Sequence, residues 1–422
     1  MAQALRTFGR ILAAHWPALG AWYLGGEAVH QLLVLLAGFV GGHTTLGGLL
    51  LLPLAVAARL VSYVAMYLSV QPSLPHSARD DDGGYRVFAG AILAAILPFF
   101  AFYAAWGMLD ADQSEFFRIA SGIALRDAGY DYDQLGDRGG LISVGVLPVA
   151  VLVIALVVRI VLARRGQRRS AGTLALAAYA EVLWTFMLFT LIGQWWGDAR
   201  VWVADRAGTV WLGGIADWFA QYVVPVAFIW EAVLWLVGLV AAVLLVPAAW
   251  LTVAGVIYGT EFDTSPAPFR NGRAALRGAL GTLARTLLQR LESLWAAVAL
   301  VWRGGPLLFG VFALAYALWA LAEYWASRGL LLAVGGHDSL FWAAFLPLLL
   351  LAVAAIAEPL RVALIATAFD TVIGIPEAGL DAADSGDDDE SGDHTIGVGD
   401  VEEEGRLGVI GEQEDRENLI GP

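Results

Sequence analysis

The sequence predicts an all-α, polytopic integral membrane protein. It would have about eight transmembrane helices as four pseudo-repeated hairpins, plus amphipathic surface helices and a disordered acidic C-terminal tail. Hydrophobic residues make up 59% of the 422 positions and charged residues only 15%, which is outside the usual range of soluble globular proteins. Several runs of about twenty apolar residues match the length of a helix that crosses a bilayer. A glycine–proline signal also recurs between these runs, which indicates an internal repeat.

The repeated signal consists of two adjacent glycines and a proline that follows after ten residues. The complete copies are Gly41-Gly42 with Pro53, Gly213-Gly214 with Pro225, and Gly335-Gly336 with Pro347. A shortened copy, Gly139-Gly140 with Pro148, lies between the first two. Each copy stands between two apolar stretches, so we interpret the glycines as the hinge of a helical hairpin and expect four such hairpins.

Each helix is predicted from its apolar run. Residues 3–14 place Leu5, Phe8 and Leu12 on one face, which is typical of a short helix on the membrane surface. The expected spans are 17–40, 46–70, 86–109, 141–163, 171–196, 222–258, 305–327 and 340–373. The sixth and eighth exceed the roughly twenty residues that a bilayer requires, so we expect them to tilt, kink or project. Pro247 and Pro359 are the predicted kink points.

These elements divide the chain into five parts. They are residues 1–70 (surface helix and first hairpin), 71–170 (second hairpin with an acidic outer loop), 171–262 (third hairpin with a Trp-rich outer loop), 263–378 (Arg-rich amphipathic helix and fourth hairpin) and 379–422 (disordered acidic tail). The amphipathic helix of the fourth part is expected at 275–296, where leucines recur at steps of three and four residues.

The distribution of arginine predicts the orientation. With the N-terminus inside, fourteen arginines lie in cytoplasmic segments before the tail and six lie on the opposite side. This bias favours a multi-pass protein of the cytoplasmic membrane with both termini in the cytoplasm. The chain lacks lysine, and its abundance of Ala, Gly, Arg and Trp indicates a prokaryotic source.

Most of the net charge belongs to the tail. Residues 380–422 contain fifteen acidic residues and two arginines, which gives −13 of the total −14, and a segment of this composition is expected to be disordered. It is a possible docking site for a cytoplasmic partner. The arginines that border the spans favour anionic lipid headgroups over nucleic acid. A membrane-protein partner is also compatible with this composition.

Several classes of chemistry are excluded or lack a signal. The chain has no cysteine and no lysine, which rules out thiolate catalysis, iron–sulfur clusters and lysine Schiff bases. It contains no Gly-x-Ser-x-Gly, His-Glu-x-x-His or phosphate-binding glycine loop. We therefore predict no catalytic residues and no cofactor, and the interpretation leans away from an enzyme.

Two outer loops are expected to differ in content. The loop at about 110–140 is rich in aspartate, but it lacks EF-hand spacing, so solvated charge is preferred over a calcium site. The loop at 198–221 spaces Trp202, Trp211 and Trp218 among polar residues, as expected for a segment at the headgroup level.

Ionisable residues inside the predicted spans are the main site candidates, because such groups are costly in a membrane unless they find partners. This intramembrane charge network comprises Glu27, His30, Arg59, Arg159, Glu181, Glu231, Glu323, Glu358 and Arg361. Alignment of the hairpins on their prolines pairs Arg59 with Glu231 and Arg159 with Glu358. The pairs would either fix how hairpins associate or line a polar pathway.

Two places in the sequence contain residue types that bind metals. Glu27 and His30 have the Glu-x-x-His spacing of di-iron bundles, but no second motif follows, so a hydrogen-bonded group with Gln31 is preferred. His43 and His337, the latter beside Asp338, occupy matching repeat positions and are weak candidates for zinc or copper. The preferred interpretation is that Thr45 and Ser339 cap the following helices, so no metal is predicted.

The sequence leaves three functions open. The first is a non-enzymatic scaffold or accessory subunit for other membrane components, and it is slightly preferred. The second is a transporter-like bundle with a central charged pathway, although the prolines do not mark broken helices at a midplane site. The third is a membrane-embedded enzyme that uses the aspartate loop on a lipid-linked substrate at the outer face.

Overall fold

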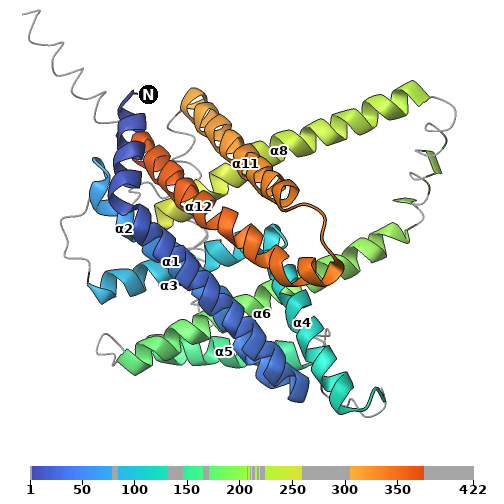
Figure 1. Cartoon of the computed structure of the whole chain (residues 1–422). Coiled ribbons are helices and arrows are strands. Elements are labelled where there is room, and N and C mark those ends of the chain that lie inside the picture. The colour runs from blue at the N-terminus through green and yellow to red at the C-terminus, as the bar shows by residue number, and fades with distance from the viewer. Residues whose placement is uncertain are drawn as a thin grey trace, which may run out of the picture. The chain divides into compact units, whose positions relative to one another are not determined.

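The computed structural model describes residues 2–77, 84–131, 138, 146–164, 171–206, 224–258 and 305–374, with short pieces between 208 and 218. Every element in these ranges is helical (Figure 1). The elements are α1 (Ala2–His43), α2 (Thr45–Val70), η1 (Gln71–Ser73), α3 (Tyr85–Ala105), α4 (Met108–Asp127), α5 (Val146–Arg164), α6 (Ala171–Ala204), α8 (Val224–Tyr258), α11 (Pro306–Val334) and α12 (Ser339–Ile373). They belong to one compact unit, Met1–Ile375.

Seven of the described helices are long and apolar enough to cross a membrane, by length and composition. They are Gln3–His43, Thr45–Ser73, Val87–Ala105, Ala175–Ala204, Phe228–Tyr258, Leu307–Val334 and Ser339–Ile373. The predicted span at 141–163 corresponds to α5, whose apolar part, Leu147–Leu162, is shorter. The chain is therefore a multi-pass helical membrane protein, with seven candidate spans and one further short apolar helix among the described residues.

The first helix is longer than predicted. The expected surface helix at 3–14 is wrong, because α1 runs without interruption for 42 residues through Pro17. Ile11 and Leu19 lie on either side of Pro17 and are both fully buried, so packing holds the helix together across the proline. At 1.5 Å per residue, α1 is about 63 Å long, roughly twice the thickness of a bilayer's hydrocarbon core.

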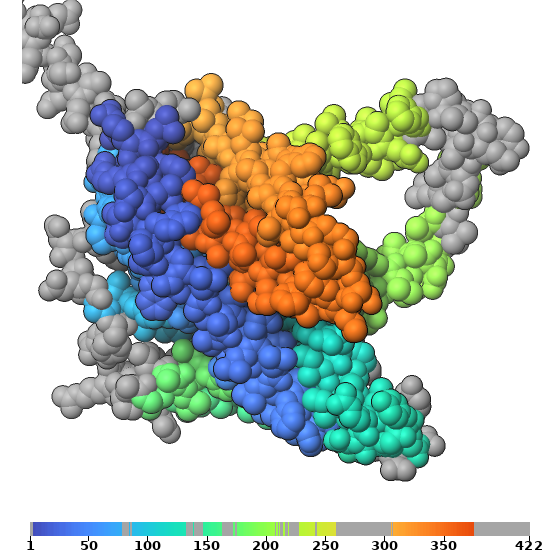
Figure 2. All heavy atoms as spheres, viewed as in Figure 1, coloured from blue at the N-terminus to red at the C-terminus, as the bar shows by residue number. Residues whose placement is uncertain are grey.

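The predicted acidic outer loop is helical over part of its length. Residues 108–127 form α4 instead of an open loop, and α4 packs along the second half of α1 (Figures 1 and 2). Phe116, Ala120 and Ala124 form a buried stripe at four-residue spacing, which is the pattern of a helix that buries one face. The charged residues of α4 obscure this stripe in the sequence, and one of them, Asp112, lies on the stripe itself and is buried.

The glycine pairs do not share one role. Gly41 and Gly42 lie inside α1, so their predicted role as a loop hinge is wrong. A Cβ on Gly41 would lie 2.7 Å from the Phe116 ring, and one on Gly42 would lie 2.7 Å from Ile123. These glycines therefore allow α1 and α4 to approach closely, as small residues do between membrane helices.

Other parts of the repeat are in different settings. Gly335 and Gly336 lie in the loop between α11 and α12, and Gly335 has a φ of 81°. Gly214 lies in a short helical piece, whereas Gly213 falls outside the described residues. Pro53, Pro225 and Pro347 lie within α2, α8 and α12, respectively. The Gly139-Gly140 copy, the predicted helix at 275–296 and the tail at 379–422 also lie outside the described residues.

Helices from distant parts of the chain form the core. α1 packs against α2, α4 and α12, and α8 contacts α3, α11 and α12. Figure 2 shows α12 beside α1 on one face of the unit, with α11 against α12 and α4 against the far end of α1. Two polar clusters lie inside this helical packing, one centred on Arg59 and the other on Arg361.

Candidate functional site

The first polar cluster joins four helices around Arg59. Arg59 lies near the midpoint of α2 and forms a bidentate ion pair with Glu27 of α1. Its Nε donates to Glu27 Oε2 at 3.0 Å, and its Nη2 donates to Glu27 Oε1 at 2.9 Å. Gln31, one turn further along α1, donates to the same carboxylate at 2.9 Å. A guanidinium held at both carboxylate oxygens fixes the orientation of both side chains.

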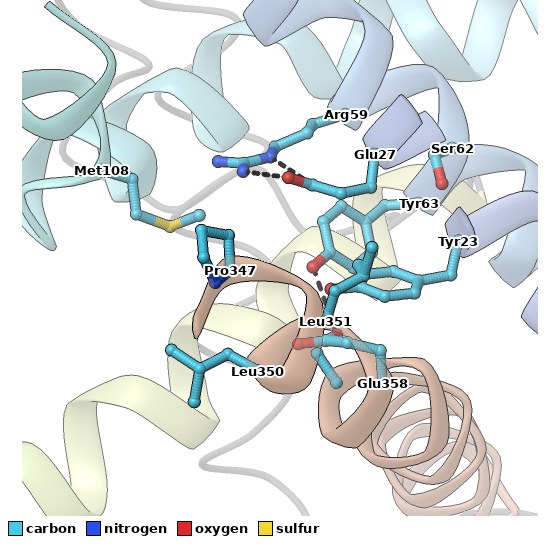
Figure 3. A pocket seen from close by; sticks show the side chains of 11 residues that line it. Tyr23, Glu27, Arg59, Ser62, Tyr63, Met108, Pro347, Leu350, Leu351 and Glu358 are labelled. Carbon is cyan, nitrogen blue, oxygen red and sulfur yellow. Dashed lines mark hydrogen bonds and ion pairs between the residues drawn. The ribbon is translucent and has the colours of Figure 1, made fainter. Parts of the chain in front are cut away.

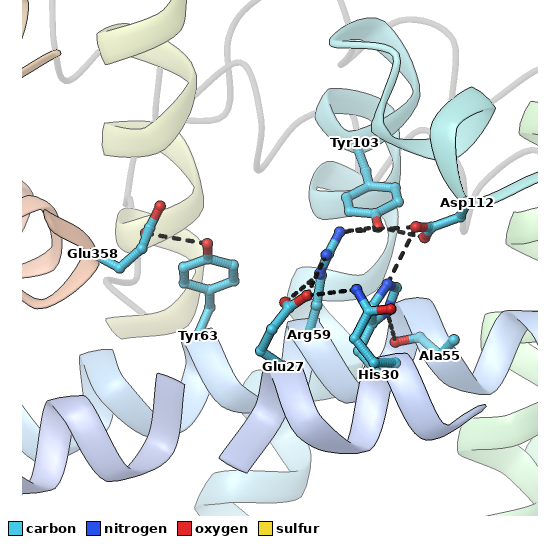
Figure 4. Close-up of polar contacts among 9 residues, drawn as sticks. Glu27, His30, Ala55, Arg59, Tyr63, Tyr103, Asp112 and Glu358 are labelled. Carbon is cyan, nitrogen blue, oxygen red and sulfur yellow. Dashed lines mark hydrogen bonds and ion pairs between the residues drawn. The ribbon is translucent and has the colours of Figure 1, made fainter. Parts of the chain in front are cut away.

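A tyrosine connects this pair to a carboxylate on α4. Arg59 Nη1 donates to Tyr103 Oη at 2.8 Å, and Tyr103 Oη donates to Asp112 Oδ2 at 2.5 Å (Figure 4). Gly107, with a φ of 72°, turns the chain between α3 and α4 and so lets Tyr103 and Asp112 face each other. A left-handed backbone of this kind costs glycine little.

His30 completes the first cluster. Its Nδ1 lies 2.9 Å from the carbonyl oxygen of Ala55, and its Nε2 lies 3.2 Å from Asp112 Oδ1. Both side chains are at least 90% buried. The predicted group of Glu27, His30 and Gln31 therefore has partners on two other helices, α2 and α4, and His30 bonds to Asp112 instead of Glu27.

The second cluster surrounds Arg361 on α12. Arg361 pairs with Glu358, one turn earlier on the same helix, and Nη2 donates to Tyr63 Oη at 2.8 Å. Tyr63 in turn donates to Glu358 Oε2 at 3.2 Å. The guanidinium lies 4.1 Å from the centre of the Trp250 ring. This cation–π interaction stabilises the buried charge of Arg361.

The two predicted pairs across hairpins are wrong. Arg59 bonds to Glu27 instead of Glu231, and Glu358 bonds to Arg361 instead of Arg159. Arg159 of α5 instead donates from Nε to Glu181 Oε2 of α6 at 2.5 Å. The predicted pairs came from aligning the hairpins on their prolines, which assumes that matching positions lie at equal depth. Each of these arginines instead bonds to an acid on its own helix or on a neighbouring helix.

Two further candidates stay apart from these clusters. Glu231 lies in an exposed stretch of α8, residues 228–240. Glu323 on α11 is half-buried, and the charge of Arg361 acts on it across the helix interface.

Of the histidines predicted as weak metal ligands, His43 lies 3.8 Å from Asp127, and His337 stacks on Phe341 with ring centres 4.0 Å apart. No group of three or more metal-ligating side chains occurs among the described residues.

A pocket of about 290 Å³ lies between the two clusters. Glu27, Arg59 and Ser62 line one side, Glu358 lines the other, and Tyr23 and Tyr63 lie between them (Figure 3). Pro347, Leu351 and Ala354 of α12, with neighbouring apolar residues, form the rest of the wall. The pocket is near the lower limit of cavities that bind small organic molecules.

The predicted charge network contained Glu27, His30, Arg59, Glu358 and Arg361 but missed Asp112 and two tyrosines that bond to these charges. Tyr63 and Tyr103 carry hydroxyl groups between buried charges, and Asp112 was assigned to an outer loop. The available signal for Asp112 was the apolar stripe of α4, which predicts a helix. No sequence signal marks Tyr63 or Tyr103, because aromatic residues are common in membrane helices.

The fold and the site define the chain as a multi-pass helical membrane protein with a polar pocket between its spanning helices. No family model matches the chain, and comparison with curated proteins and with solved structures found no match. The pocket and its charges are therefore the features that indicate a function.

Proposed function

We propose that this protein is a transporter-like bundle that binds a small polar solute in the pocket between α1, α2 and α12. The observation that carries this proposal is the position of the charged lining. Arg59 and Glu358 lie near the midpoints of two candidate spans, and both line the same pocket as Glu27. Ionisable groups this far inside membrane helices normally mark the path of an ion or solute.

The pocket has the chemistry expected of a solute site. Carboxylate, guanidinium and hydroxyl groups converge on it, so it offers both donors and acceptors for hydrogen bonds. A bundle whose only requirement is stable association does not need an open volume beside its buried charges. The structure thus moves our preference from a scaffold to transport.

Water access to the pocket tests this proposal. The native chain lacks cysteine, so a single introduced thiol reports on one position. We expect Ala354→Cys, in the pocket wall, to react with a charged, membrane-impermeant methanethiosulfonate reagent in proteoliposomes from both sides. The control is Ile356→Cys on the same helix, whose native side chain is 57% exposed outside the pocket and which we expect to face lipid. Equal, slow labelling of both variants would contradict a solute pathway.

The proposed orientation is a prokaryotic cytoplasmic membrane with both termini inside. Contacts at one end of the unit support termini on the same side. His15 near the start of α1 bonds to Ser73 at 2.7 Å, and the backbone N–H of His76 donates to Asp370 near the end of α12 at 2.8 Å. External labelling of Gly336→Cys in intact cells tests the side, and labelling only after lysis would reverse the orientation.

A scaffold is the second candidate, and one stretch of α8 favours it. Every residue from 228 to 240 is exposed, and Trp230 and Trp235 are more than 60% exposed. Lipid or another membrane protein must cover such a surface. A photo-crosslinker at position 235 in native membranes distinguishes a surface covered by protein from one covered by lipid, because a protein neighbour gives a discrete adduct and lipid does not.

The enzymatic alternative loses its main support. Asp112 is buried against His30, whereas Asp127 lies beside His43 near the other end of α4. The described carboxylates of the region at 110–140 therefore do not converge on one reaction site.

A further inference from the structure

The contacts of His30 require a proton between His30 and Asp112. The carbonyl oxygen of Ala55 only accepts hydrogen bonds, so the His30 Nδ1 at 2.9 Å must carry a hydrogen. The other ring nitrogen, Nε2, lies 3.2 Å from Asp112 Oδ1. A neutral imidazole with its hydrogen on Nδ1 and an ionised carboxylate are both acceptors at this contact. A second proton, on the ring or on the carboxyl group, must therefore join them.

The remaining contacts of Asp112 do not replace this proton. Tyr103 donates to the other carboxylate oxygen at 2.5 Å, and its own oxygen accepts from Arg59. Arg59 Nη1 is 3.9 Å from Asp112 Oδ1, beyond hydrogen-bond distance, because the other two nitrogens of the guanidinium are bonded to Glu27. The arginine thus stands between two carboxylates and bonds directly to one.

The charges in this cluster balance only while that proton is present. Glu27 and Arg59 cancel each other, and the protonated pair of His30 and Asp112 is neutral overall. Loss of the proton leaves two carboxylates facing one guanidinium, with a net charge of −1. Such a charge among buried helices is costly unless a cation compensates it.

We propose that the site exchanges one proton on the His30–Asp112 pair for one small monovalent cation at Glu27. When the proton leaves to water, Arg59 moves the short distance toward Asp112 and releases Glu27 into the pocket. The cation then binds the Glu27 carboxylate, so one positive charge leaves and one enters. This inference rests on the proposed solute pocket and names the ions that it exchanges.

The oxygen lining of the pocket fits this ligand class. Glu27, Ser62 and the hydroxyls of Tyr23 and Tyr63 supply oxygen donors beside the carboxylate, and oxygen is the ligand that hard cations prefer. Glu358 also lines the pocket, but Arg361 on the same helix balances its charge. A single uncompensated charge therefore selects a monovalent cation.

Every titratable group shown to contact the pair belongs to this scheme. Tyr103 of α3 faces Asp112, Arg59 of α2 faces both acids, and Glu27 of α1 lies one turn before His30. On α12, Glu358 and Arg361 lie across the pocket and bond to Tyr63. Tyr63 and Tyr103 are hydrogen-bonded hydroxyls, so the exchangeable proton is assigned to the histidine and the aspartate.

Cation binding at several pH values tests the exchange. The full chain in nanodiscs is titrated with NaCl, KCl or methylammonium chloride between pH 5 and 9, with N-methylglucamine chloride keeping ionic strength constant. Binding is followed as a rise in melting temperature. One proton released per cation predicts an apparent Kd that falls about tenfold per pH unit within the exchange window. A Kd that does not depend on pH would overturn the exchange.

Two variants and a matched control locate the exchange. Asp112→Asn removes the ionisable acid, so we expect the pH slope to vanish and binding at high pH to weaken at least tenfold. Glu27→Gln should weaken cation binding at least tenfold while the ring-nitrogen NMR signals of His30 still change with pH. His43→Gln is the control, because His43 also meets an aspartate of α4 but is 53% exposed, and its slope should equal that of the native chain. An unchanged slope in Asp112→Asn would overturn the assignment.

NMR of the six histidines separates this inference from the proposed function. His30 is identified by the signal missing in His30→Gln. If the ring-nitrogen signals of His30 do not change between pH 4 and 10, the proton site is wrong, and labelling of Ala354→Cys still decides whether the pocket is a solute pathway. If these signals change and cations bind at no pH, the exchange is wrong. If the thiol is also unreactive, the proposed function fails with it.

Discussion

The chain contains two copies of the sequence Val-Gly-Gly-His, at 40–43 and 334–337, and the structure uses them differently. In the first copy the glycines lie inside α1 and pack against α4. In the second they form a loop, and Gly335 adopts a φ of 81°. The same four residues therefore make a helix contact in one place and a turn in the other.

The residues that follow explain the difference. Gly47 and Gly48 come after the first copy, whereas Phe341 and Trp342 stand at the matching positions after the second. A Cβ on Gly48 would lie 2.8 Å from Gly41 Cα and 2.8 Å from Ala37 O, so these glycines bring α1 and α2 together. In the second copy, the ring of Phe341 stacks on His337 instead. The structure of this short motif therefore depends on which helix or side chain the flanking residues allow it to contact.

The largest effect is expected where backbones meet. Gly48→Ala should lower the free energy of unfolding by about 2–3 kcal/mol, because the new methyl group meets backbone atoms that cannot move aside. Gly25→Ala is the control, since no atom lies within 4 Å of its added carbon. Unfolding in mixed detergent micelles measures both variants. Equal stability of the two would show that the first copy is not a close contact.

The next effect concerns the loop of the second copy. Gly335→Ala should destabilise the protein by about 1–2 kcal/mol, because an L-residue at this positive φ is strained. Gly336→Ala should change stability little, since its φ is not in the left-handed region and its added carbon meets nothing within 4 Å. Melting curves followed by tryptophan fluorescence compare the two variants. A larger loss for Gly336→Ala would contradict the described turn.

Helix caps give a smaller contrast. Asp338 accepts a hydrogen bond from the backbone N–H of Phe341 at 2.7 Å, whereas Thr44, the equivalent residue, makes no side-chain cap bond. The residues predicted to cap, Thr45 and Ser339, instead occupy the first positions of α2 and α12. We expect Asp338→Ala to cost about 1 kcal/mol and Thr44→Ala less than about 0.5 kcal/mol. Chemical unfolding at neutral pH measures the loss of stability in each variant. A larger loss for Thr44→Ala than for Asp338→Ala would reject the cap assignment.

The smallest effect tests the outer surface of α4, the helix that only the first copy contacts. The hydrogen bonds and charge of Arg118 hold the pKa of Glu115 below its ordinary value. The folded state therefore gains stability above the unfolded pKa of Glu115 and loses it as pH falls through the lowered folded value. Because the pair is largely exposed, Arg118→Ala should cost only about 0.3–0.5 kcal/mol at pH 7. The difference from the native chain should shrink as pH falls through the lowered pKa of Glu115.

The described part of the chain shows which features were predictable. The apolar stretches at 46–70, 222–258 and 340–373 correspond closely to α2, α8 and α12, because hydropathy is a property of each segment. Helix α4 was missed because its aspartates outweighed the buried stripe of Phe116, Ala120 and Ala124. The continuity of α1 through Pro17 was missed because it depends on packing against other helices.

The sequence by itself determined that the chain is helical and apolar enough to cross a membrane, and that several charges lie within its spans. Only the tertiary structure decided which charges meet. Glu27 and Arg59 are 32 residues apart and Tyr63 and Glu358 are 295 apart, so their contacts depend on the rotation and depth of each helix. Those two quantities arise from packing between helices, and no local pattern in the sequence encodes them.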